Sequence, residues 1–482
     1  MITEALGRFV VVCVVTGALP TTMSDAGVAA PVGHVARERG WHAPAVIATL
    51  WFAVIANGGA IVWLWLHGGG VSGVHSLTDL WTSLGRVTGL LAVYLALGQI
   101  LLLARLPPLE RLVGFDRLTV WHRTNGKACL VLVLAHVVFI TLGYAGLDQV
   151  GLSAEINRLV SDYPGMVAAV VGTALMIGVV ATSIVIVRRR LPYEAWYTVH
   201  LSVYAGIVLA YVHQPPTGNE FTANAVQLDY WIALYVAVLA VLVWFRVVAP
   251  IRAVRRHRLR VEEVIEEAPG IHSVVIAGRA LDRLGAHGGQ FMTWRFLDRR
   301  RWWQAHPFSL SALPHDGRMR ITVKGVGRYT HDLAQLRRGT RVVAEGPFGR
   351  FTAERCRREG ALLIAGGIGI TPIRTIIEEL PPGPVDVIHR VMHEDELVFT
   401  SELDEIAAQR GAHVHRLVGD HRDPQWSHLL SPFHLRELVP EVCDREVFVC
   451  GPPAMVSHIL ASLRTLGVTH RHIHTERFAL AS

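Results

Sequence analysis

Long uncharged stretches dominate the first half of the chain, and none follows residue 250. A helix needs about 20 predominantly apolar residues to cross the hydrocarbon core of a bilayer. An apolar stretch from Phe9 to about Thr22, within an N-terminal segment of residues 1–42, is either an extra span or an uncleaved signal-like segment. Six further stretches of suitable length predict six transmembrane helices, at residues 43–66, 87–104, 128–147, 163–187, 195–213 and 230–245.

The basic residues between these stretches indicate how the chain crosses the membrane, because cytoplasmic loops are enriched in Lys and Arg. The loops at 67–85, 144–162 and 214–229 contain a single arginine, Arg158, and no lysine. We therefore expect the other loops, and everything after residue 250, to be cytoplasmic in a multi-pass cell-membrane protein. The basic residues that define this side include Arg37, Arg39, Arg105, Arg111, Arg117, Arg188, Arg189, Arg190 and Arg246.

The composition agrees with a membrane protein. Hydrophobic residues make up 51% of the 482 residues, charged residues make up 18%, and the net charge is +7. A positive charge also occurs in nucleic-acid-binding proteins, but here many basic residues lie between apolar stretches, so we expect membrane lipid and no nucleic acid as a partner. The five cysteines show no C-x-x-C spacing, which argues against a disulfide scaffold or an iron–sulfur cluster.

After residue 255 the hydrophobic pattern changes to short strands. In residues 255–352 the strands are separated by Gly and Pro turns, which predicts a small antiparallel β-barrel. In residues 358–482 the strands ALLIAGG, PVDVIHRV, AHVHRLV and EVFVCGP alternate with helices, which predicts a doubly wound α/β nucleotide-binding domain. We therefore expect a multi-domain membrane protein with an α-helical transmembrane bundle at residues 43–250.

Four histidines lie on the predicted spans when their flanking residues are included, His122 and His136 on the third and its N-terminal flank, and His200 and His213 on the fifth. Both helices run outward from the cytoplasm, so these residues form an inner and an outer pair about 20 Å apart. Two facing imidazoles can hold a haem iron, and the alternative is four polar side chains bonded to neighbouring helices. On an ideal helix residues 200 and 213 point about 140° apart, so the outer pair requires a distorted helix end near the Pro-Pro sequence that follows.

The sequence AGGIGITP, at residues 365–372, closes a predicted strand and opens a helix. Glycines there allow the backbone to approach the pyrophosphate of a dinucleotide, which then meets the helix N-terminus. A glycine-rich turn alone is common, but the CGPPAM sequence after the last hydrophobic strand resembles the motif that borders the nicotinamide site in the ferredoxin-reductase-like superfamily. The candidate coenzyme-binding residues are Gly366, Gly367, Gly369, Thr371, Pro372, Gly451 and Pro452.

The histidine pairs, with the sequences LGRVTGLL, LARLPPLERLVGFDRL and WHRTNGK around them, resemble the ferric-reductase-like transmembrane domain. Ferric-chelate reductases and NADPH oxidases share that domain. The sequence His306-Pro307-Phe308-Ser309 resembles the flavin-binding motif of the ferredoxin-reductase-like superfamily, in the variant typical of the transmembrane reductases. The resemblance covers about residues 84–482 and implies FAD, a nicotinamide coenzyme and two b-type haems as cofactors.

The resemblance implies roles for individual residues of the soluble half. Phe308 would lie against the flavin ring and Ser309 would hydrogen-bond its polar edge. Cys450 would border the nicotinamide, and Phe478 would cover the flavin until the nicotinamide displaces it, although Ala479–Ser482 follow Phe478 here. The sequence VKGVGRYT matches the family's pyrophosphate loop, which would use Lys324, Gly327 and Thr330.

Arg390 ends the second strand of the nucleotide-binding domain and is placed to meet a ribose 2′-phosphate, with Arg416 as a helper. The alternative is a solvated arginine at a strand end. This placement favours NADPH, and NADH is the alternative coenzyme.

The function implied by the resemblance is electron transfer from cytoplasmic NADPH through FAD and two haems to an acceptor on the outer face. A ferric or cupric chelate is the expected acceptor, and oxygen, a quinone or a partner protein are alternatives. Arg86 matches an arginine beside the outer haem of superoxide-generating oxidases, but Ile140 stands where those enzymes have a histidine. Another alternative is a flavin reductase anchored by a membrane domain without haem. No motif specifies an accessory subunit.

Overall fold

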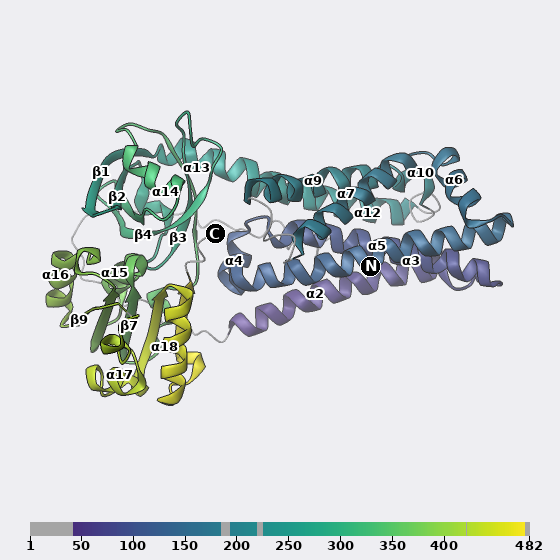
Figure 1. The fold of residues 1–482 in the computed structure, drawn as a ribbon. Coiled ribbons are helices and arrows are strands. Elements are labelled where there is room, and N and C mark those ends of the chain that lie inside the picture. Colours follow the sequence, from purple (N-terminus) through teal and green to yellow (C-terminus); the bar gives the residue numbers. More distant parts are fainter. Residues whose placement is uncertain (1–41, 185–192, 219–224, 421, 478–482) are drawn as a thin grey trace, which may run out of the picture. The chain divides into compact units, whose positions relative to one another are not determined.

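The computed structural model describes residues 42–184, 193–218, 225–420 and 422–477. The chain divides into two compact units (Figure 1). The membrane unit comprises Met1–Leu106 and Phe115–Arg246, and the soluble unit comprises Pro107–Gly114 and Val247–Ser482. The candidate seventh span at residues 9–22, the basic residues 188–190 and Phe478 lie outside the described residues.

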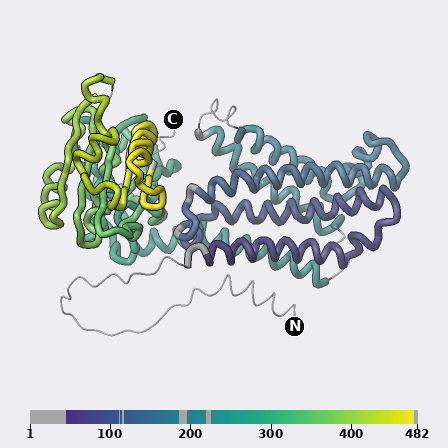
Figure 2. The backbone as a smooth tube through the Cα atoms, turned by 90° about the horizontal axis from the view of Figure 1, so that it is seen from below, coloured from purple at the N-terminus to yellow at the C-terminus, as the bar shows by residue number. Residues whose placement is uncertain are grey.

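Within the described residues, six helices are long and apolar enough to cross a membrane, which confirms the six predicted spans. The helices of the membrane unit lie side by side along a common direction (Figure 2). The spanning helices are α2 (His42–Trp65), α3 (Leu77–Leu102), α5 (Phe115–Asp148), α7 (Met166–Ser183), α9 (Tyr193–Tyr211) and α12 (Ala225–Val243). The shorter helices are α6 (Leu152–Asp162) and α10 (Gln214–Thr217), and α12 continues through η2 (Trp244–Val248) into α13 (Ala249–His257).

Two spanning helices begin well before the apolar stretches that predict them. Helix α3 begins at Leu77 because Ser76 caps it, its Oγ accepting the N–H of Asp79 at 3.2 Å. Helix α5 begins at Phe115 and includes the polar turns around Lys127. Hydropathy detects only the apolar part of such helices, so it places their N-terminal ends too late.

The flavin domain is a six-stranded antiparallel sheet in the order β1-β2-β5-β4-β3-β6. An isolated antiparallel bridge between Arg260 and Arg341 links the edge strands, as expected for a small barrel. The side chains of Trp294, Phe296 and Ile321 are fully buried in its core. The strands are β1 (Arg260–Ala268), β2 (Ile271–Ala277), β3 (Phe291–Phe296), β4 (His306–His315), β5 (Arg318–Lys324) and β6 (Val342–Phe348), and the short helix α14 (Arg328–Asp332) follows β5.

The nucleotide-binding domain is a five-stranded parallel sheet in the order β11-β10-β7-β8-β9. Alternate residues of β7 pack on opposite sides, Leu363 against α15 and Leu362 against the α17–α18 side, so helices cover both faces. This confirms the predicted doubly wound α/β fold. The strands are β7 (Gly360–Gly366), β8 (Val385–Val391), β9 (His413–Val418), β10 (Arg445–Gly451) and β11 (Ile473–Arg477), and the helices are α15 (Ile370–Glu379), α16 (Thr400–Arg410), α17 (Pro432–Leu438) and α18 (Pro453–Thr465).

Two features of the soluble unit are not evident from the hydrophobic pattern. Strand β11 is short and polar, and it adds a fifth strand beside β10. Helix α4 (Pro107–Val113), which separates the second and third spans, belongs to the soluble unit. The guanidinium of Arg350 donates to the carbonyl of Val113 at 3.1 Å and holds this helix beside β6.

Candidate functional site

The two histidine pairs face each other within the membrane unit. The ring centroids of His122 and His200 are 6.0 Å apart, and those of His136 and His213 are 6.4 Å apart. A metal–imidazole bond is about 2 Å long and the ring centre lies about 1 Å further out, so two ligands on opposite sides of one iron have centroids about 6 Å apart. Both pairs have the spacing that a haem with two imidazole ligands requires.

Hydrogen bonds at Nδ1 orient one ring in each pair. His136 Nδ1 lies 2.7 Å from the carbonyl oxygen of Gly85, and His200 Nδ1 lies 3.3 Å from Ser183 Oγ. A carbonyl only accepts hydrogen bonds, so Nδ1 of His136 carries the proton and Nε2 keeps the lone pair that a metal needs. The Nδ1 atoms of His122 and His213 are buried without a well-aligned hydrogen-bond partner in the described part of the chain.

Glycines on α3 provide the space for the outer pair. A Cβ at Gly89 would lie 2.6 Å from His136 Nδ1, and one at Gly85 would lie 2.7 Å from Ile140 Cδ1. Further along the same helix, a Cβ at Gly98 would meet nothing within 4 Å. Small residues let helices in a membrane approach closely, and here they bring α3 against the ligand-bearing face of α5.

The donor set fits haem better than a bare metal ion. No group of three or more His, Cys, Asp or Glu side chains is placed to hold a metal ion within the described ranges. A haem brings four nitrogen ligands of its own, so the protein needs to supply only one imidazole on each side. The residues that would hold the two haems are His122 with His200 and His136 with His213.

The flavin motif occupies the first residues of β4. Pro307 is exposed, His306 and Phe308 are half-buried, and Ser309 is buried. The indole N–H of Trp294 donates to the carbonyl of Phe308 at 3.0 Å and fixes this strand to β3.

The predicted pyrophosphate loop lies beside this motif, because the His306 ring packs on the Tyr329 ring with centroids 3.7 Å apart. Within the loop, Thr330 Oγ1 accepts the N–H groups of Val326 and Gly327 at 2.9 and 3.0 Å, so this hydroxyl shapes the turn. The Lys324 ammonium lies 2.6 Å from the carboxylate of Glu396, in η7 (Glu394–Glu396) of the nucleotide-binding domain. Burial raises the pKa of Glu396, but the hydrogen bond and charge of Lys324 outweigh it, so the net pKa is lowered.

The glycine-rich turn after β7 meets the start of α18 at the point where the strand order reverses. A Cβ at Gly366 would lie 2.5 Å from Met455 Sδ, and one at Gly451 would lie 3.1 Å from Gly366 Cα. A Cβ at Gly369 would collide with the carbonyl of Cys450. Gly367 has a φ of 52°, a left-handed conformation that favours glycine. Doubly wound sheets bind nucleotides at this switch point, and only glycines fit here.

Cys450 is the next-to-last residue of β10, at the same point, and is fully buried. Burial raises the pKa of its thiol, and the neighbouring carboxylate of Glu476 raises it further. The thiol therefore stays protonated at neutral pH. In this form it is a small, weakly polar side chain and a poor nucleophile.

Comparison with known proteins finds matches in three parts of the chain. Residues 88–211 match the family described as ferric reductase like transmembrane component, residues 274–352 match an FAD-binding domain, and residues 363–460 match an oxidoreductase NAD-binding domain. The chain is thus similar to a ferric-reductase-like component in its membrane unit and to FAD- and NAD-binding domains in its soluble unit.

Similar proteins include reductase components of oxygenase systems. The ferredoxin reductase component of 3-ketosteroid-9-alpha-monooxygenase from Mycolicibacterium smegmatis is 32% identical over 234 residues, which are 46% of this chain and 65% of that protein. The glycine betaine monooxygenase reductase subunit from Chromohalobacter salexigens is 25% identical over 240 residues, 46% of this chain and 64% of that protein. The chain thus spans less than two thirds of either relative.

A solved ferredoxin NADP+ reductase from Neisseria gonorrhoeae with bound FAD and NADP is 18% identical. The similarity covers 46% of this chain and 97% of that chain, with a TM-score of 0.39.

In the nucleotide-binding domain the two candidate phosphate-binding arginines differ in exposure. Arg390 is only 8% exposed, and its guanidinium donates to the carbonyls of Val391, Leu417 and Gly419. The side chain of Arg416 is 29% exposed and pairs with Asp404 at 2.6 Å. Arg416 Nε has no hydrogen-bond partner in the part of the chain that the structure describes. The Arg390 guanidinium therefore stabilises the backbone of the domain, and the Arg416 guanidinium is the more accessible of the two.

His389, which no motif in the sequence singles out, also lies at the site. This residue is 1% exposed on β8, and its Nε2 lies 3.2 Å from the carbonyl oxygen of Gly367 in the glycine-rich turn. Burial lowers the pKa of His389 to about 4, against the opposing effect of this hydrogen bond. A neutral imidazole therefore buttresses the turn. The only signal for it in the sequence was its position, next to Arg390 at the end of a strand.

Strand β11, the last strand of the nucleotide-binding domain, leads to the same place. Strand β11 pairs with β10 in parallel, with Arg477 opposite Gly451. The described part of β11 therefore ends at the switch point, beside the candidate nicotinamide site.

Proposed function

We propose that this protein transfers electrons from cytoplasmic NADPH across the cell membrane and reduces a ferric or cupric chelate on the outer face. The two facing histidine pairs are the observation that carries the proposal. His122 and His136 are fourteen residues apart on α5, a rise of about 21 Å, so the pairs lie at two depths of one bundle. Two redox centres at these depths would divide the distance that an electron must cross through the hydrocarbon core into shorter transfers.

The residues of the chain would each hold one part of this path. Phe308 and Ser309 would contact the flavin, and Gly366 and Gly451 would admit the coenzyme. The four histidines would hold two b-type haems, and these groups together with FAD would supply the chemistry that converts a two-electron donor into single electrons. With two imidazoles held against each iron, the outer site would offer no open position, so the acceptor would be reduced without binding to the metal.

The residues around the outer pair favour a chelate over oxygen as the acceptor. Arg86, which matches the oxidase arginine, donates to the carbonyl of Gly68 at 3.2 Å. Ile140, at the position of the oxidase histidine, packs an apolar side chain toward Gly85. Superoxide formation is the second candidate function, supported by Arg86 alone.

The test uses full-length protein in sealed vesicles with NADPH on the cytoplasmic side. His122→Ala should retain reduction of a dye on that side and lose reduction of a membrane-impermeant ferric chelate on the other. His67→Ala is the control, because His67 lies in a span but bonds the carbonyl of Trp63 in its own helix. If His122→Ala still reduces the impermeant chelate, the proposed route is wrong. Superoxide measured in parallel decides between the two acceptors.

A further inference from the structure

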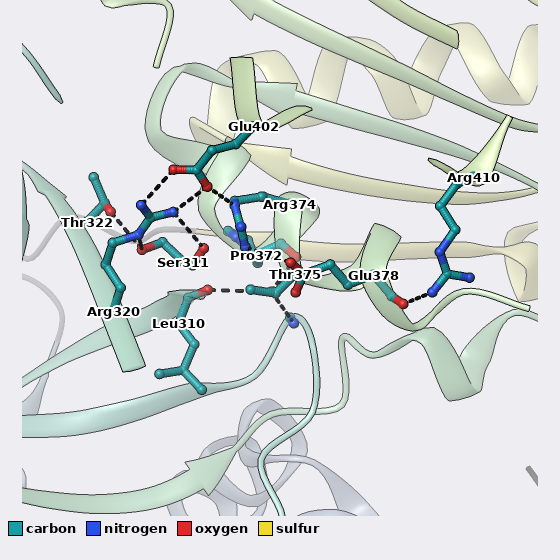
Figure 3. Close-up of polar contacts among 11 residues, drawn as sticks. Leu310, Ser311, Arg320, Thr322, Pro372, Arg374, Thr375, Glu378, Glu402 and Arg410 are labelled. Carbon is teal, nitrogen blue, oxygen red and sulfur yellow. Dashed lines mark hydrogen bonds and ion pairs between the residues drawn. The ribbon is translucent and has the colours of Figure 1, made fainter. Parts of the chain in front are cut away.

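Strand β4, which carries the flavin motif, and helix α15, which follows the coenzyme turn, belong to different domains of the soluble unit. One hydroxyl group contacts both. Thr375, on α15, is fully buried, and its Oγ1 accepts the N–H of Gly289 at 2.9 Å. The same oxygen lies 3.0 Å from the carbonyl oxygen of Pro372 and 3.5 Å from that of Leu310 (Figure 3). Leu310 directly follows Ser309 of the flavin motif, and Pro372 belongs to the coenzyme turn. Thr375 therefore contacts backbone next to both candidate sites.

A carboxylate from a third element reinforces this contact. Glu402, on α16, accepts two hydrogen bonds from the Arg320 guanidinium of β5, at 2.8 and 2.7 Å. Its Oε2 also accepts the Nε–H of Arg374 of α15 at 2.5 Å. Figure 3 shows Glu402 between the two arginines, one from each domain.

The surroundings make this carboxylate difficult to replace. The arginine side chains are only 13% and 11% exposed, and that of Glu402 is 32% exposed. Burial raises the pKa of Glu402, but the hydrogen bond and charge of Arg320, together with the charge of Arg374, lower it more. Glu402 is therefore ionised at neutral pH. Without its charge, two largely buried guanidinium groups would face each other across the domain boundary.

Arg320 also holds the flavin strand directly. Its Nε donates to Ser311 Oγ at 3.2 Å, and that oxygen accepts a second hydrogen bond from Thr322 at 2.7 Å. Arg374 lies two residues beyond the coenzyme motif, which ends at Pro372, and its Nη1 is 3.1 Å from Glu378 Oε1 on the same helix. The chain of contacts runs from β4 through Arg320, Glu402 and Arg374 to α15.

We propose that Glu402 and Thr375 are positioning residues that set the distance between the flavin and the nicotinamide. This inference rests on the proposed function of the soluble unit. Hydride transfer between the nicotinamide and flavin rings requires reacting atoms about 3–3.5 Å apart. A displacement of about 1 Å can lower the rate by about 100-fold. Glu402 and Thr375 belong to neither cofactor motif, so they act through Leu310, Ser311 and the first turns of α15.

The test replaces Glu402 with Gln in the full-length protein, which removes the charge and keeps the shape. Stopped-flow bleaching of the flavin by NADPH should slow by about 10- to 100-fold. The FAD content should stay at the wild-type level, and the KM for NADPH should change by less than about 3-fold, because the binding motifs are intact. A second readout is hydrogen exchange, which should speed up in residues 288–291 and 308–312 without coenzyme present.

Glu262→Gln is the matched control. Glu262 accepts two hydrogen bonds from Arg318, both at 2.8 Å, but this pair joins β1 and β5 within the barrel. We expect wild-type flavin reduction and wild-type exchange at the domain boundary. An equal slowing in both variants would show a general loss of stability and would overturn the proposal.

Thr375→Val provides an independent test if Glu402→Gln does not fold. Valine matches the shape of threonine and lacks the acceptor for the Gly289 N–H, so flavin reduction should slow by about 3- to 10-fold. Wild-type reduction rates in the folded variants would overturn the positioning role. A failure of the transmembrane proposal would give a different result. A protein without haem would still show NADPH-dependent bleaching of its flavin, and Glu402→Gln would still slow that bleaching.

Discussion

His213 faces His136 with ring centroids 6.4 Å apart. On an ideal helix the side chains of His200 and His213 would point about 140° apart, so both could not face the same neighbouring helix. Helix α9 ends at Tyr211, where the N–H of Val212 donates to the carbonyl of Leu209 at 3.3 Å and tightens the last turn. His213 then precedes the Pro-Pro turn of α10. The distorted helix end reorients the ring toward its partner.

The four histidines lead to a prediction about haem content. Purified full-length protein should contain two b-type haems if, as proposed, each histidine pair holds one iron. Alanine at any of the four positions should remove at least one haem, measured by pyridine haemochrome stoichiometry and reduced-minus-oxidised spectra. The His67→Ala variant should keep both. Wild-type spectra in all four variants would refute the ligand assignment.

Gly89 allows a prediction specific to the outer pair. A methyl group at this position would lie 2.6 Å from His136 Nδ1, so Gly89→Ala should displace the ring and lower the outer haem content by at least half. Gly98→Ala on the same helix is the control, because its methyl group would meet nothing within 4 Å. Equal haem content and equal redox titration curves in the two variants would contradict the assigned role of Gly89.

Coenzyme choice should depend on Arg416 more than on Arg390. Loss of a charge-assisted phosphate contact costs about 1.5–3 kcal/mol, so Arg416→Ala should raise the KM for NADPH by roughly 10- to 100-fold and leave the KM for NADH nearly unchanged. Arg390→Ala should affect both coenzymes alike and lower thermal stability, because its guanidinium bonds three backbone carbonyls. Steady-state kinetics with both coenzymes, in both variants, test this assignment.

His389 should make the nucleotide-binding domain sensitive to acid. The folded protein keeps this ring neutral down to a pKa of about 4, whereas an unfolded histidine binds a proton near 6.5. The free energy of unfolding should therefore fall by up to about 3 kcal/mol as the pH decreases from 6.5 to 4. Hydrogen exchange of β8 in the full-length protein at the two pH values measures this loss. His389→Gln should remove it, and an unchanged pH dependence would refute the explanation.

The sequence predicted the features that depend on local patterns. Apolar length identified the six spans, and strand–turn–helix order identified the doubly wound sheet. The glycine-rich turn and the CGPPAM sequence were expected to form one coenzyme-binding site. The structure brings Gly366 of the first against Gly451 of the second.

Features that depend on long-range packing were not predictable. The sequence makes Arg390 a candidate for a ribose 2′-phosphate, but it does not reveal that the turn after β9 provides the carbonyl of Gly419 to this guanidinium. The ion pair of Lys324 requires Glu396, which lies in the other soluble domain. Strand β11 lacks a hydrophobic pattern because it is a short edge strand, and its pairing with β10 becomes visible only in three dimensions.

The position of Glu402 between Arg320 and Arg374 also constrains how this protein can evolve. A lineage that exchanged Glu402 first would leave the two largely buried guanidinium groups with only their other carboxylates, Arg320 with Glu267 at 3.9 Å and Arg374 with Glu378 at 3.1 Å. The three positions should therefore be retained together or lost together among relatives with this domain arrangement. A pair such as Arg318 and Glu262 lies within one domain and is free of that three-way dependence. The boundary between the two soluble domains should thus diverge in rare concerted changes, while the rest of the surface drifts one residue at a time.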